Sequence, residues 1–424
     1  MNTLSRRSLF MGSAGFSAAA IAGSAWSNAS ASASPEQLAR AEDHWADIAL
    51  QYDTMADITN LENGYWGMMA KPVLAHYQAR TIQVNRENSY YARRSFNQES
   101  LGARRRLAEL LGVETGEIAF TRGATEALQN LIGGYHRVTA HDAVMFADLD
   151  YGAMQAAMVS VAARVGADVV KLEIPEPADY DGLLAFYAKA LDDHPQTKLL
   201  LLTHISHRTG LCLPIRQITA LARARGVDTI VDAAHSWGQM DFQIADLGAD
   251  FVGFNLHKWI GAPLGVGLLY INKARLDAIT PNISAEPYEK DLTSGRVHTG
   301  TTNFAAILSV TAALDFHQHI GPKHKEQRLR YLRNRWVAGV QDLPNIEILT
   351  PNDARLHAGI TSFRVKGRTT AQANIALVET LLREHQIFTV HRTGIASGAC
   401  VRISPSMYNL AADMDRLAEA LAHI

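Results

Sequence analysis

Short, continuous apolar runs alternate with helix-compatible stretches through the middle of this 424-residue chain, and this alternation constrains the fold more than any other feature. A strand that is apolar on both sides must be covered on both faces, as in a parallel sheet flanked by helices. One of the helices has clear ends, because Pro214 precedes it and Gly226 follows it. The sequence therefore predicts an α/β fold with a mostly parallel, doubly wound sheet. The strands are expected at Ala143–Leu149, Asp168–Ile174, Lys198–Ile205, Asp228–Asp232, Phe251–Phe254 and Val266–Ile271.

The C-terminal part of the chain has a different pattern, in which two long helices precede shorter strands and helices. We expect the long helices at 305–320 and 323–343, and strands at Ile346–Leu349, Gly359–Val365, Ile387–His391 and Val401–Ser404. This pattern predicts a smaller α+β domain, packed tightly on the first because no glycine-serine linker separates them. The expected division is a strap at 34–60 that packs on the small domain, a large domain at 61–305 and a small C-terminal domain at 306–424.

The first 33 residues have the composition of an export signal. Arg6 and Arg7 precede an apolar stretch of small residues from Met11 to Ala25, and further small residues that suit cleavage follow up to Ala33. This order predicts a twin-arginine signal peptide at 1–33, the twin-arginine export machinery as a partner, and a periplasmic or secreted mature protein. Membrane anchoring is the alternative, but the stretch is short and rich in Gly, Ala and Ser, so no stable membrane insertion is expected.

Charge, cysteines and histidines exclude several other classes of function. The formal net charge is −2 and the basic residues are dispersed apart from Arg104–Arg106, so no nucleic-acid partner is expected. The two cysteines, Cys212 and Cys400, cannot form a cysteine-based zinc cage. Several histidines follow strand ends and could bind a metal, but they lack the His-x-x-x-His spacing of a helical site, so none is expected. These histidines are His204, His207, His235 and His257.

Lys258 follows directly on an apolar strand and precedes a glycine-punctuated turn. An ammonium group is costly to bury, so the pKa of this lysine should fall, and an uncharged amine can form a Schiff base with a carbonyl. A surface lysine whose amine extends into solvent is the alternative. Asp232 ends another apolar run, at the edge where open α/β sheets bind their ligands.

Lys258 and Asp232 together suggest pyridoxal 5'-phosphate as the cofactor. This cofactor needs a lysine for its carbonyl and a carboxylate against its pyridine nitrogen, since a protonated ring acts as an electron sink. It also needs a phosphate site, and Thr121–Leu128 offers one, where a strand turns through Gly-Ala-Thr into a helix and points amide N–H groups at an anion. Taken alone, the same pattern could be an ordinary helix start.

These motifs, in this order, resemble the class V aminotransferases of the fold-type-I pyridoxal phosphate enzymes. The family includes cysteine desulfurases, kynureninases and isopenicillin N epimerase, and the resemblance covers about residues 60–410. The string Asn255-Leu-His-Lys-Trp259, followed by Ala262-Pro263, is most similar to the isopenicillin N epimerase-like branch. The resemblance implies a large domain with a doubly wound sheet, a smaller C-terminal domain, and a homodimer with shared active sites.

The resemblance also implies roles for individual residues. Lys258 would be the Schiff-base lysine and would move the proton at Cα, with Asp232 on the ring nitrogen and Tyr151 stacked on the ring. A tyrosine with its hydroxyl in water is the alternative for Tyr151. The remaining cofactor contacts would come from Ala124, Thr125, His207, His235, Asn255 and His257, with Gly300 and Thr301 reaching the phosphate of the neighbouring subunit. His207 stands where much of the family has asparagine.

Three residues are expected to bind the substrate. Arg402 resembles the family's arginine for the substrate α-carboxylate, which a guanidinium binds through two parallel hydrogen bonds. A structural salt bridge is the alternative for Arg402. Arg392 is a second candidate for the carboxylate, and Asn63 is expected at the substrate entrance.

The sequence leaves the reaction open. We expect proton abstraction at Cα of an amino acid or an amino-acid-containing substrate, a small molecule, leading to epimerisation or amino-group transfer. A C–S or C–N lyase is an alternative, and a secreted non-catalytic binding protein is another. A desulfurase is disfavoured, because it needs a thiolate on the loop before Arg402, whereas Cys400 lies two residues before Arg402 within the expected strand.

Overall fold

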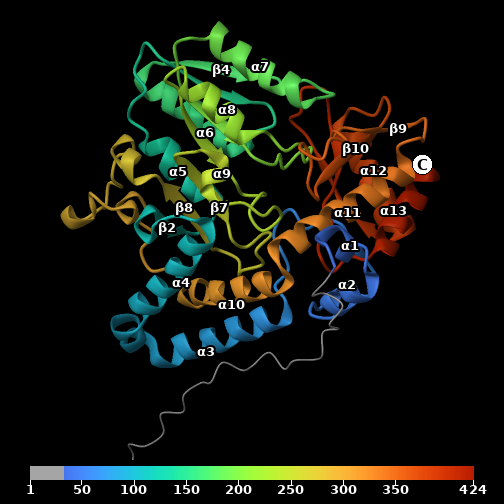
Figure 1. The fold of residues 1–424 in the computed structure, drawn as a ribbon, viewed down its shortest axis with the longest axis horizontal. Helices are drawn as coiled ribbons and strands as arrows, with labels where there is room; N and C mark the ends of the chain where they lie inside the picture. Colours follow the sequence, from blue (N-terminus) through green and yellow to red (C-terminus); the bar gives the residue numbers. More distant parts are fainter. Residues whose placement is uncertain (1–32) are drawn as a thin grey trace, which may run out of the picture.

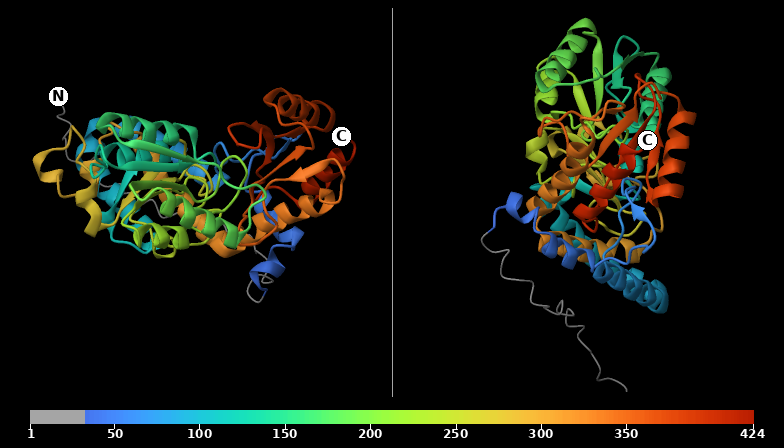
Figure 2. Two further views of the ribbon diagram at one scale, coloured as in Figure 1. Left: turned by 90° about the horizontal axis from the view of Figure 1, so that it is seen from above. Right: turned by 90° about the vertical axis from the view of Figure 1, so that its right-hand side faces the viewer.

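The computed structural model describes residues 33–424, which form two domains side by side (Figures 1 and 2). The predicted export signal lies outside the described residues, apart from Ala33. In the described part of the chain, no helix combines the length and apolarity needed to cross a membrane.

A seven-stranded sheet forms the centre of the large domain, in the order β2-β8-β7-β6-β5-β3-β4. β8 runs antiparallel to β2 and β7, and the other adjacent pairs are parallel. The mostly parallel α/β architecture predicted from the sequence is therefore confirmed. The strands are β2 (Ile118–Thr121), β3 (Ala143–Ala147), β4 (Asp168–Leu172), β5 (Thr197–Thr203), β6 (Asp228–Asp232), β7 (Phe251–Asn255) and β8 (Gly267–Ile271).

Both faces of this sheet are buried along its inner strands, which explains why these strands are continuous apolar runs, whereas most of the edge strand β4 is exposed. Along β3, Met145 and Ala147 join one core cluster, whereas Val144 and Phe146 join another on the opposite face. Helices cover both faces (Figure 1). They are α3 (Lys71–Arg94), α4 (Phe96–Leu111), α5 (Ala124–Gly134), α6 (Gly152–Val165), α7 (Tyr180–Asp193), α8 (Ile215–Arg223), α9 (Ile244–Leu247) and α10 (Phe304–Ile320).

The small domain is built on a four-stranded antiparallel sheet in the order β12-β13-β10-β9. Its strands are β9 (Ile346–Ile348), β10 (Thr361–Val365), β12 (Val390–Arg392) and β13 (Cys400–Ile403). Its helices are α11 (Pro322–Val340), α12 (Ala371–His385) and α13 (Ala411–Ala422). A third core cluster, which includes Trp336 and Phe363, lies between this sheet and the helices.

The N-terminal segment connects the two domains. α1 (Pro35–Leu38) packs on α11, while Trp45 and Ile48 of α2 (Glu42–Ala49) lie in a core cluster shared with the large domain. β1 (Thr59–Asn60) pairs in parallel with β11 (Ile387–Phe388), so the chain enters the large domain from the edge of the small one.

Two expectations from the sequence need correction. The helix at 304–320, expected in the small domain, packs against α3 and α4 of the large domain, because its apolar residues, such as Val310 and Leu314, join the large-domain core. The single strand expected at Ile387–His391 is split, because β11 pairs with β1 whereas β12 pairs with β13.

Candidate active site

A cavity of about 610 Å³ lies where five strands of the large sheet end, and arginines of the small domain form part of its wall. β2, β3, β5, β6 and β7 have their carboxyl ends at this edge, where open α/β sheets bind ligands. Most residues predicted for the site line this cavity. They are Ala124, Thr125, Tyr151, His207, Asp232, His235, Asn255, His257, Lys258, Arg392 and Arg402.

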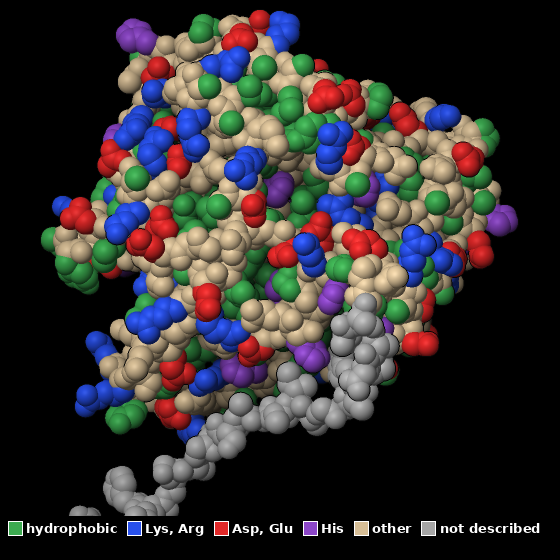
Figure 3. Space-filling view, in the orientation of Figure 1, with side chains coloured by type: hydrophobic (Ala, Val, Ile, Leu, Met, Phe, Trp, Pro, Cys, Tyr) green, Lys and Arg blue, Asp and Glu red, His purple; other side chains and the backbone are tan. Residues whose placement is uncertain are grey.

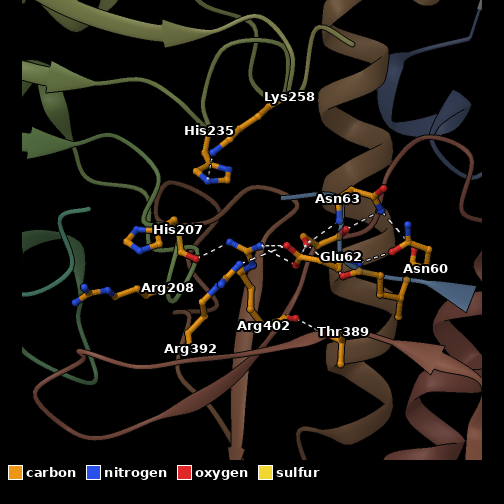
Figure 4. A network of polar contacts seen from close by, with 12 residues as sticks. Asn60, Glu62, Asn63, His207, Arg208, His235, Lys258, Thr389, Arg392 and Arg402 are labelled. Atoms are coloured by element: carbon orange, nitrogen blue, oxygen red, sulfur yellow. Dashed lines mark hydrogen bonds and ion pairs between the residues drawn. The ribbon is translucent and has the colours of Figure 1, made fainter. Parts of the chain in front are cut away.

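Lys258 lies in the loop after β7, with its amine directed at His235 (Figure 4). Its Nζ lies 3.0 Å from Nε2 of His235. On the other side of the same imidazole, Nε1 of Trp259 lies 3.3 Å from Nδ1, and because an indole N–H can only donate, Nδ1 accepts. In a neutral imidazole the proton is then on Nε2, so His235 donates to a lone pair of an uncharged Lys258 amine.

Burial favours these uncharged forms. The pKa of Lys258 falls to about 8, chiefly because burial penalises the ammonium; Asp232 opposes the shift and Arg402 adds to it. Burial also lowers the pKa of His235 well below its ordinary value. The amine of Lys258 can therefore act as a nucleophile or a base near neutral pH.

Asp232 is the last residue of β6 and is 4% exposed. Its Oδ1 accepts the N–H of Ala234 at 2.9 Å. Burial raises the pKa of Asp232, although the Ala234 N–H and the nearby Lys258 lower it. A cation beside this carboxylate, such as a protonated pyridine nitrogen, would offset the cost of burying its charge.

The turn from β2 into α5 forms an anion site at one end of the cavity. The N–H of Ala124, at the start of α5, donates to Oδ1 of Asn255 at 2.7 Å, which fixes this turn to the end of β7. A Cβ on Gly123 would lie 3.0 Å from that same Oδ1, so glycine permits the close approach. Thr125 follows in the first turn of the helix, where N–H groups and the helix dipole favour a phosphate.

His257 closes the side of this anion site nearest β8. Its Nδ1 lies 3.1 Å from the carbonyl oxygen of Val266, and because a carbonyl only accepts, Nδ1 carries a proton. Burial lowers the pKa of His257 to about 4, so the ring is neutral near pH 7 and its Nε2 has a free lone pair.

Tyr151 and His207 lie on the wall formed after β3 and β5. Their rings meet edge to face, with centroids 5.2 Å apart and an interplanar angle of 89°. Tyr151 is 41% exposed at the cavity, which leaves one ring face available for a bound aromatic group. Burial, followed by the charge of Arg208, lowers the pKa of His207 well below its ordinary value, and its Nδ1 has no hydrogen-bond partner.

Arg402 is already paired with a carboxylate of the protein. Its Nη2 donates to both oxygens of Glu62, at 2.5 and 2.7 Å, and its Nη1 donates to the His207 carbonyl at 2.6 Å (Figure 4). Arg392 lies beside this pair, with its Nη2 3.4 Å from Oε1 of Glu62. Sequence reasoning missed Glu62, since no local pattern signals a contact across 340 residues of chain.

Three predicted residues do not line this cavity. Asn63 was expected at the substrate entrance, but its Nδ2 donates to the Ser404 carbonyl at 3.0 Å and its Oδ1 accepts from the Tyr408 hydroxyl. The next residues, Gly64 and Tyr65, line the cavity instead. Gly300 and Thr301, expected to serve a neighbouring subunit, are exposed and lie outside the cavity of their own chain.

The residues at this edge fit pyridoxal 5'-phosphate. The glycine-bounded turn suits a phosphate, the buried carboxylate of Asp232 suits a protonated ring nitrogen, and the amine of Lys258, with its lowered pKa, suits a carbonyl carbon. A metal is less suited to the site, because in residues 33–424 no three His, Cys, Asp or Glu side chains converge as ligands.

Comparisons with known proteins agree with this geometry. The family model "Aminotransferase class-V" matches residues 70–417. Isopenicillin N epimerase from Streptomyces clavuligerus is 30% identical over 337 residues, which cover 75% of this chain and 83% of the epimerase. A probable cysteine desulfurase from Vibrio cholerae is 27% identical over 364 residues, 82% of this chain and 88% of the desulfurase.

Solved structures of similar fold include pyridoxal phosphate enzymes. A mutant of the protein C-DES with glycine covalently linked to the pyridoxal phosphate cofactor has a TM-score of 0.75 and 25% identity, over 88% of this chain and 98% of that chain. The cystine C–S lyase C-DES with its product cysteine persulfide has a TM-score of 0.73 and 25% identity, over 87% and 98% of the two chains. The expectations of this cofactor and of its fold-type-I architecture are confirmed.

Proposed function

The chain belongs to the class-V aminotransferase family, and from that premise we propose that it abstracts a proton from Cα of an amino acid or an amino-acid-containing substrate, leading to epimerisation or amino-group transfer. The chain is a pyridoxal phosphate enzyme of that family. The observation that supports this proton transfer is the buried Lys258 amine, which lies 3.0 Å from Nε2 of His235 in a cavity that Asp232 and Arg402 also line.

Each residue has a distinct task in the proposed reaction. Pyridoxal phosphate, when bound, supplies an electron sink for negative charge that develops at Cα. Lys258 takes the Cα proton and returns it, while Asp232 keeps a positive charge at the far end of the cavity. Arg402 orients the substrate through its carboxylate, and the N–H groups at the start of α5 hold a phosphate away from the reacting atoms.

Neither cysteine is placed for desulfurase chemistry. Cys400 is buried in β13 and burial raises its pKa to about 11, while burial raises the pKa of Cys212 to about 12. A desulfurase that carries sulfur on its own thiol needs a reactive thiolate at the cavity, and neither residue lines it. These facts favour reactions that leave the substrate side chain intact.

The test is an amino-acid panel incubated with the enzyme in heavy water. We expect deuterium at Cα of at least one amino acid, together with inversion or keto-acid formation, as measured by mass spectrometry and chiral chromatography. The proposal would be contradicted if sulfide were released while neither deuterium at Cα nor a keto acid was found.

A C–S or C–N lyase is the second candidate, and the similarity to the cystine C–S lyase C-DES favours it. A lyase of this kind releases its product without a thiol on the enzyme, so the burial of Cys400 does not argue against it. The same panel separates the two, because a lyase would release sulfur or nitrogen from the side chain.

We also propose a homodimer with shared active sites. The segment from 281 to 299 projects from the large domain (Figures 1 and 2), and Figure 3 shows apolar side chains at the same edge. Ile283 is fully exposed and Tyr288 is 75% exposed. A second copy of the chain would cover them, and Gly300 and Thr301 follow directly in sequence.

A further inference from the structure

The carboxylate of Glu62 is hydrogen-bonded to the guanidinium of Arg402, the group expected to bind the substrate. The Glu62 side chain is 6% exposed and that of Arg402 is 1% exposed, so this is a buried ion pair. Both oxygens of Glu62 accept from Nη2 of Arg402, and Oε2 also lies 3.3 Å from the Ser404 hydroxyl. A substrate carboxylate that approaches Arg402 therefore meets a resident carboxylate of the same chemistry.

The backbone fixes Glu62 at this place. Its N–H donates to Oδ1 of Asn60 at 2.9 Å, and the residue forms a parallel bridge with Ser404, two residues beyond Arg402. An exchange of partners therefore needs only a movement of the Glu62 side chain.

Arg392 offers that side chain a second partner. β12 and β13 are antiparallel, with Val390 opposite Arg402 and Arg392 opposite Cys400, so the two arginines are diagonal neighbours on one face. Nη2 of Arg392 lies 3.4 Å from Oε1 of Glu62, within reach of a small rotation. In Figure 4 both arginines point at Glu62 from the same side.

The three groups together carry one positive charge in excess. Two guanidiniums face one carboxylate, and the Nε atoms of both arginines are buried without a hydrogen-bond partner. One further carboxylate would balance the cluster, whereas an uncharged group would leave the excess charge buried.

We propose that Glu62 is a resident counter-ion that yields Arg402 to the substrate's carboxylate by shifting to Arg392, which makes the site selective for a substrate with one carboxylate at this position. The inference deepens the proposed function and rests on it for the identity of the ligand. Leaving a buried carboxylate unpaired would be strongly unfavourable. The shift avoids this cost, because each carboxylate keeps a guanidinium partner throughout.

Propionate and propionamide test this exchange on the purified holoenzyme, because neither carries an amine and both are inert to the chemistry at Lys258. Thermal stabilisation as a function of ligand concentration gives the affinity of each. We expect Glu62→Gln to bind propionate roughly tenfold more tightly than the wild type, since no resident carboxylate must be displaced, with little change for propionamide. Glu176→Gln is the matched control, because it removes the same charge from the Arg364 pair, which lies outside this cavity, and should leave propionate affinity unchanged.

Variants of Arg392 distinguish a shift of Glu62 to Arg392 from direct binding of the ligand by Arg392. Arg392→Gln should weaken propionate binding at least tenfold, because Glu62 then has no second partner, and adding Glu62→Gln to Arg392→Gln should restore it. A double variant that binds propionate as weakly as Arg392→Gln alone would mean that Arg392 holds the ligand itself, and would overturn the proposal. Unchanged, weaker or absent propionate binding in Glu62→Gln would overturn it too. Because the probes have no amine, these outcomes are independent of whether the enzyme exchanges protons at Cα.

Discussion

Two effects favour the uncharged form of the Lys258 amine. Burial lowers its pKa to about 8, and the hydrogen bond that Trp259 donates to His235 leaves only Nε2–H of the imidazole to face the amine. An ammonium at Lys258 would place its own hydrogens against that N–H. Trp259 therefore acts on Lys258 through His235, without contacting the reacting atoms.

Replacing Trp259 by phenylalanine should raise the pKa of Lys258. Without the indole N–H, Nδ1 of His235 can carry the proton, and Nε2 can accept a hydrogen bond from an ammonium. The midpoint should move up from about 8, by ~1 pH unit if one hydrogen bond is exchanged. The rate of reductive methylation of Lys258 in the cofactor-free protein, followed by peptide mass spectrometry across pH, measures this midpoint, since only the uncharged amine reacts.

Trp336→Phe is the control for the loss of a buried indole, because the Trp336 side chain is fully buried and its Nε1 has no partner. An equal shift in both variants would show that the effect comes from packing. An unchanged midpoint in Trp259→Phe would show that His235 does not transmit it.

The residues of the cavity could be predicted only where the sequence marks them locally. Lys258 and Asp232 follow apolar strands, and parallel strands bring their carboxyl ends together, so both could be assigned to one site. Glu62 has no such mark, because its pairing with Arg402 depends on how the strap meets the small sheet. Asn63 was wrongly placed at the entrance for the same reason, as a change of one residue along an extended chain reverses the direction of the side chain.

The turn from β2 into α5 is positioned by two glycines, Gly123 in the turn itself and Gly267 at the start of β8. A Cβ on Gly267 would lie 2.4 Å from Cα of Gly123 and 2.6 Å from the Phe254 carbonyl oxygen. The start of β8 therefore lies so close to the turn from β2 into α5 that no side chain fits between them. This contact connects the shape of the anion site to the packing of the antiparallel strand.

Gly267→Ala should lower the free energy of unfolding by about 1–3 kcal/mol, because the added methyl group must displace backbone. It should also weaken the binding of pyridoxal phosphate by distorting the turn. Gly102→Ala in α4 is the control, since a Cβ there meets nothing within 4 Å and alanine should add about 0.5–1 kcal/mol of stability. Urea unfolding of the cofactor-free protein and a fluorescence titration with cofactor measure the two effects, and wild-type values for Gly267→Ala would contradict this account.

Helices and strands were predicted correctly where the hydrophobic period was clear. The predictions failed where tertiary packing determined the domain or the partner strand of an element. Most strands of the large sheet lie within two residues of their expected limits, and the inner ones among them are buried on both faces. α10 was assigned to the wrong domain, because a helix that is apolar around most of its surface does not reveal which core it joins. The division into β11 and β12 depends on partners far away in sequence, which periodicity cannot indicate.

At the scale of the whole molecule, the cavity lies between two domains that contribute different chemistry. The large domain supplies Lys258, Asp232 and the anion site, whereas the small domain supplies the arginines. Glu62 follows directly after the N-terminal strap and pairs with Arg402 of the small domain, so movement of the small domain would change the carboxylate site without disturbing the cofactor residues.

The proposed homodimer with shared active sites predicts that subunits can complement one another. Thr301→Ala should weaken retention of pyridoxal phosphate, because the phosphate loses a contact from the neighbouring chain. Mixing these subunits with Lys258→Ala subunits, which have an intact Thr301, should restore tight binding at the hybrid sites, as measured by cofactor release after exchange of subunits. A monomer of 46.4 kDa in sedimentation equilibrium, or no restoration in the mixture, would contradict a shared site.

The most direct test of the central claim is the incorporation of solvent deuterium at Cα by the wild type and by Lys258→Ala, each loaded with pyridoxal phosphate and given the most responsive amino acid of the panel. Mass spectrometry of the recovered amino acid counts the exchanged protons. If Lys258 moves the Cα proton, the wild type exchanges it and Lys258→Ala loses at least a hundredfold in rate, the usual contribution of a positioned acid–base group. Equal exchange by both proteins would contradict the assignment of this proton transfer to Lys258.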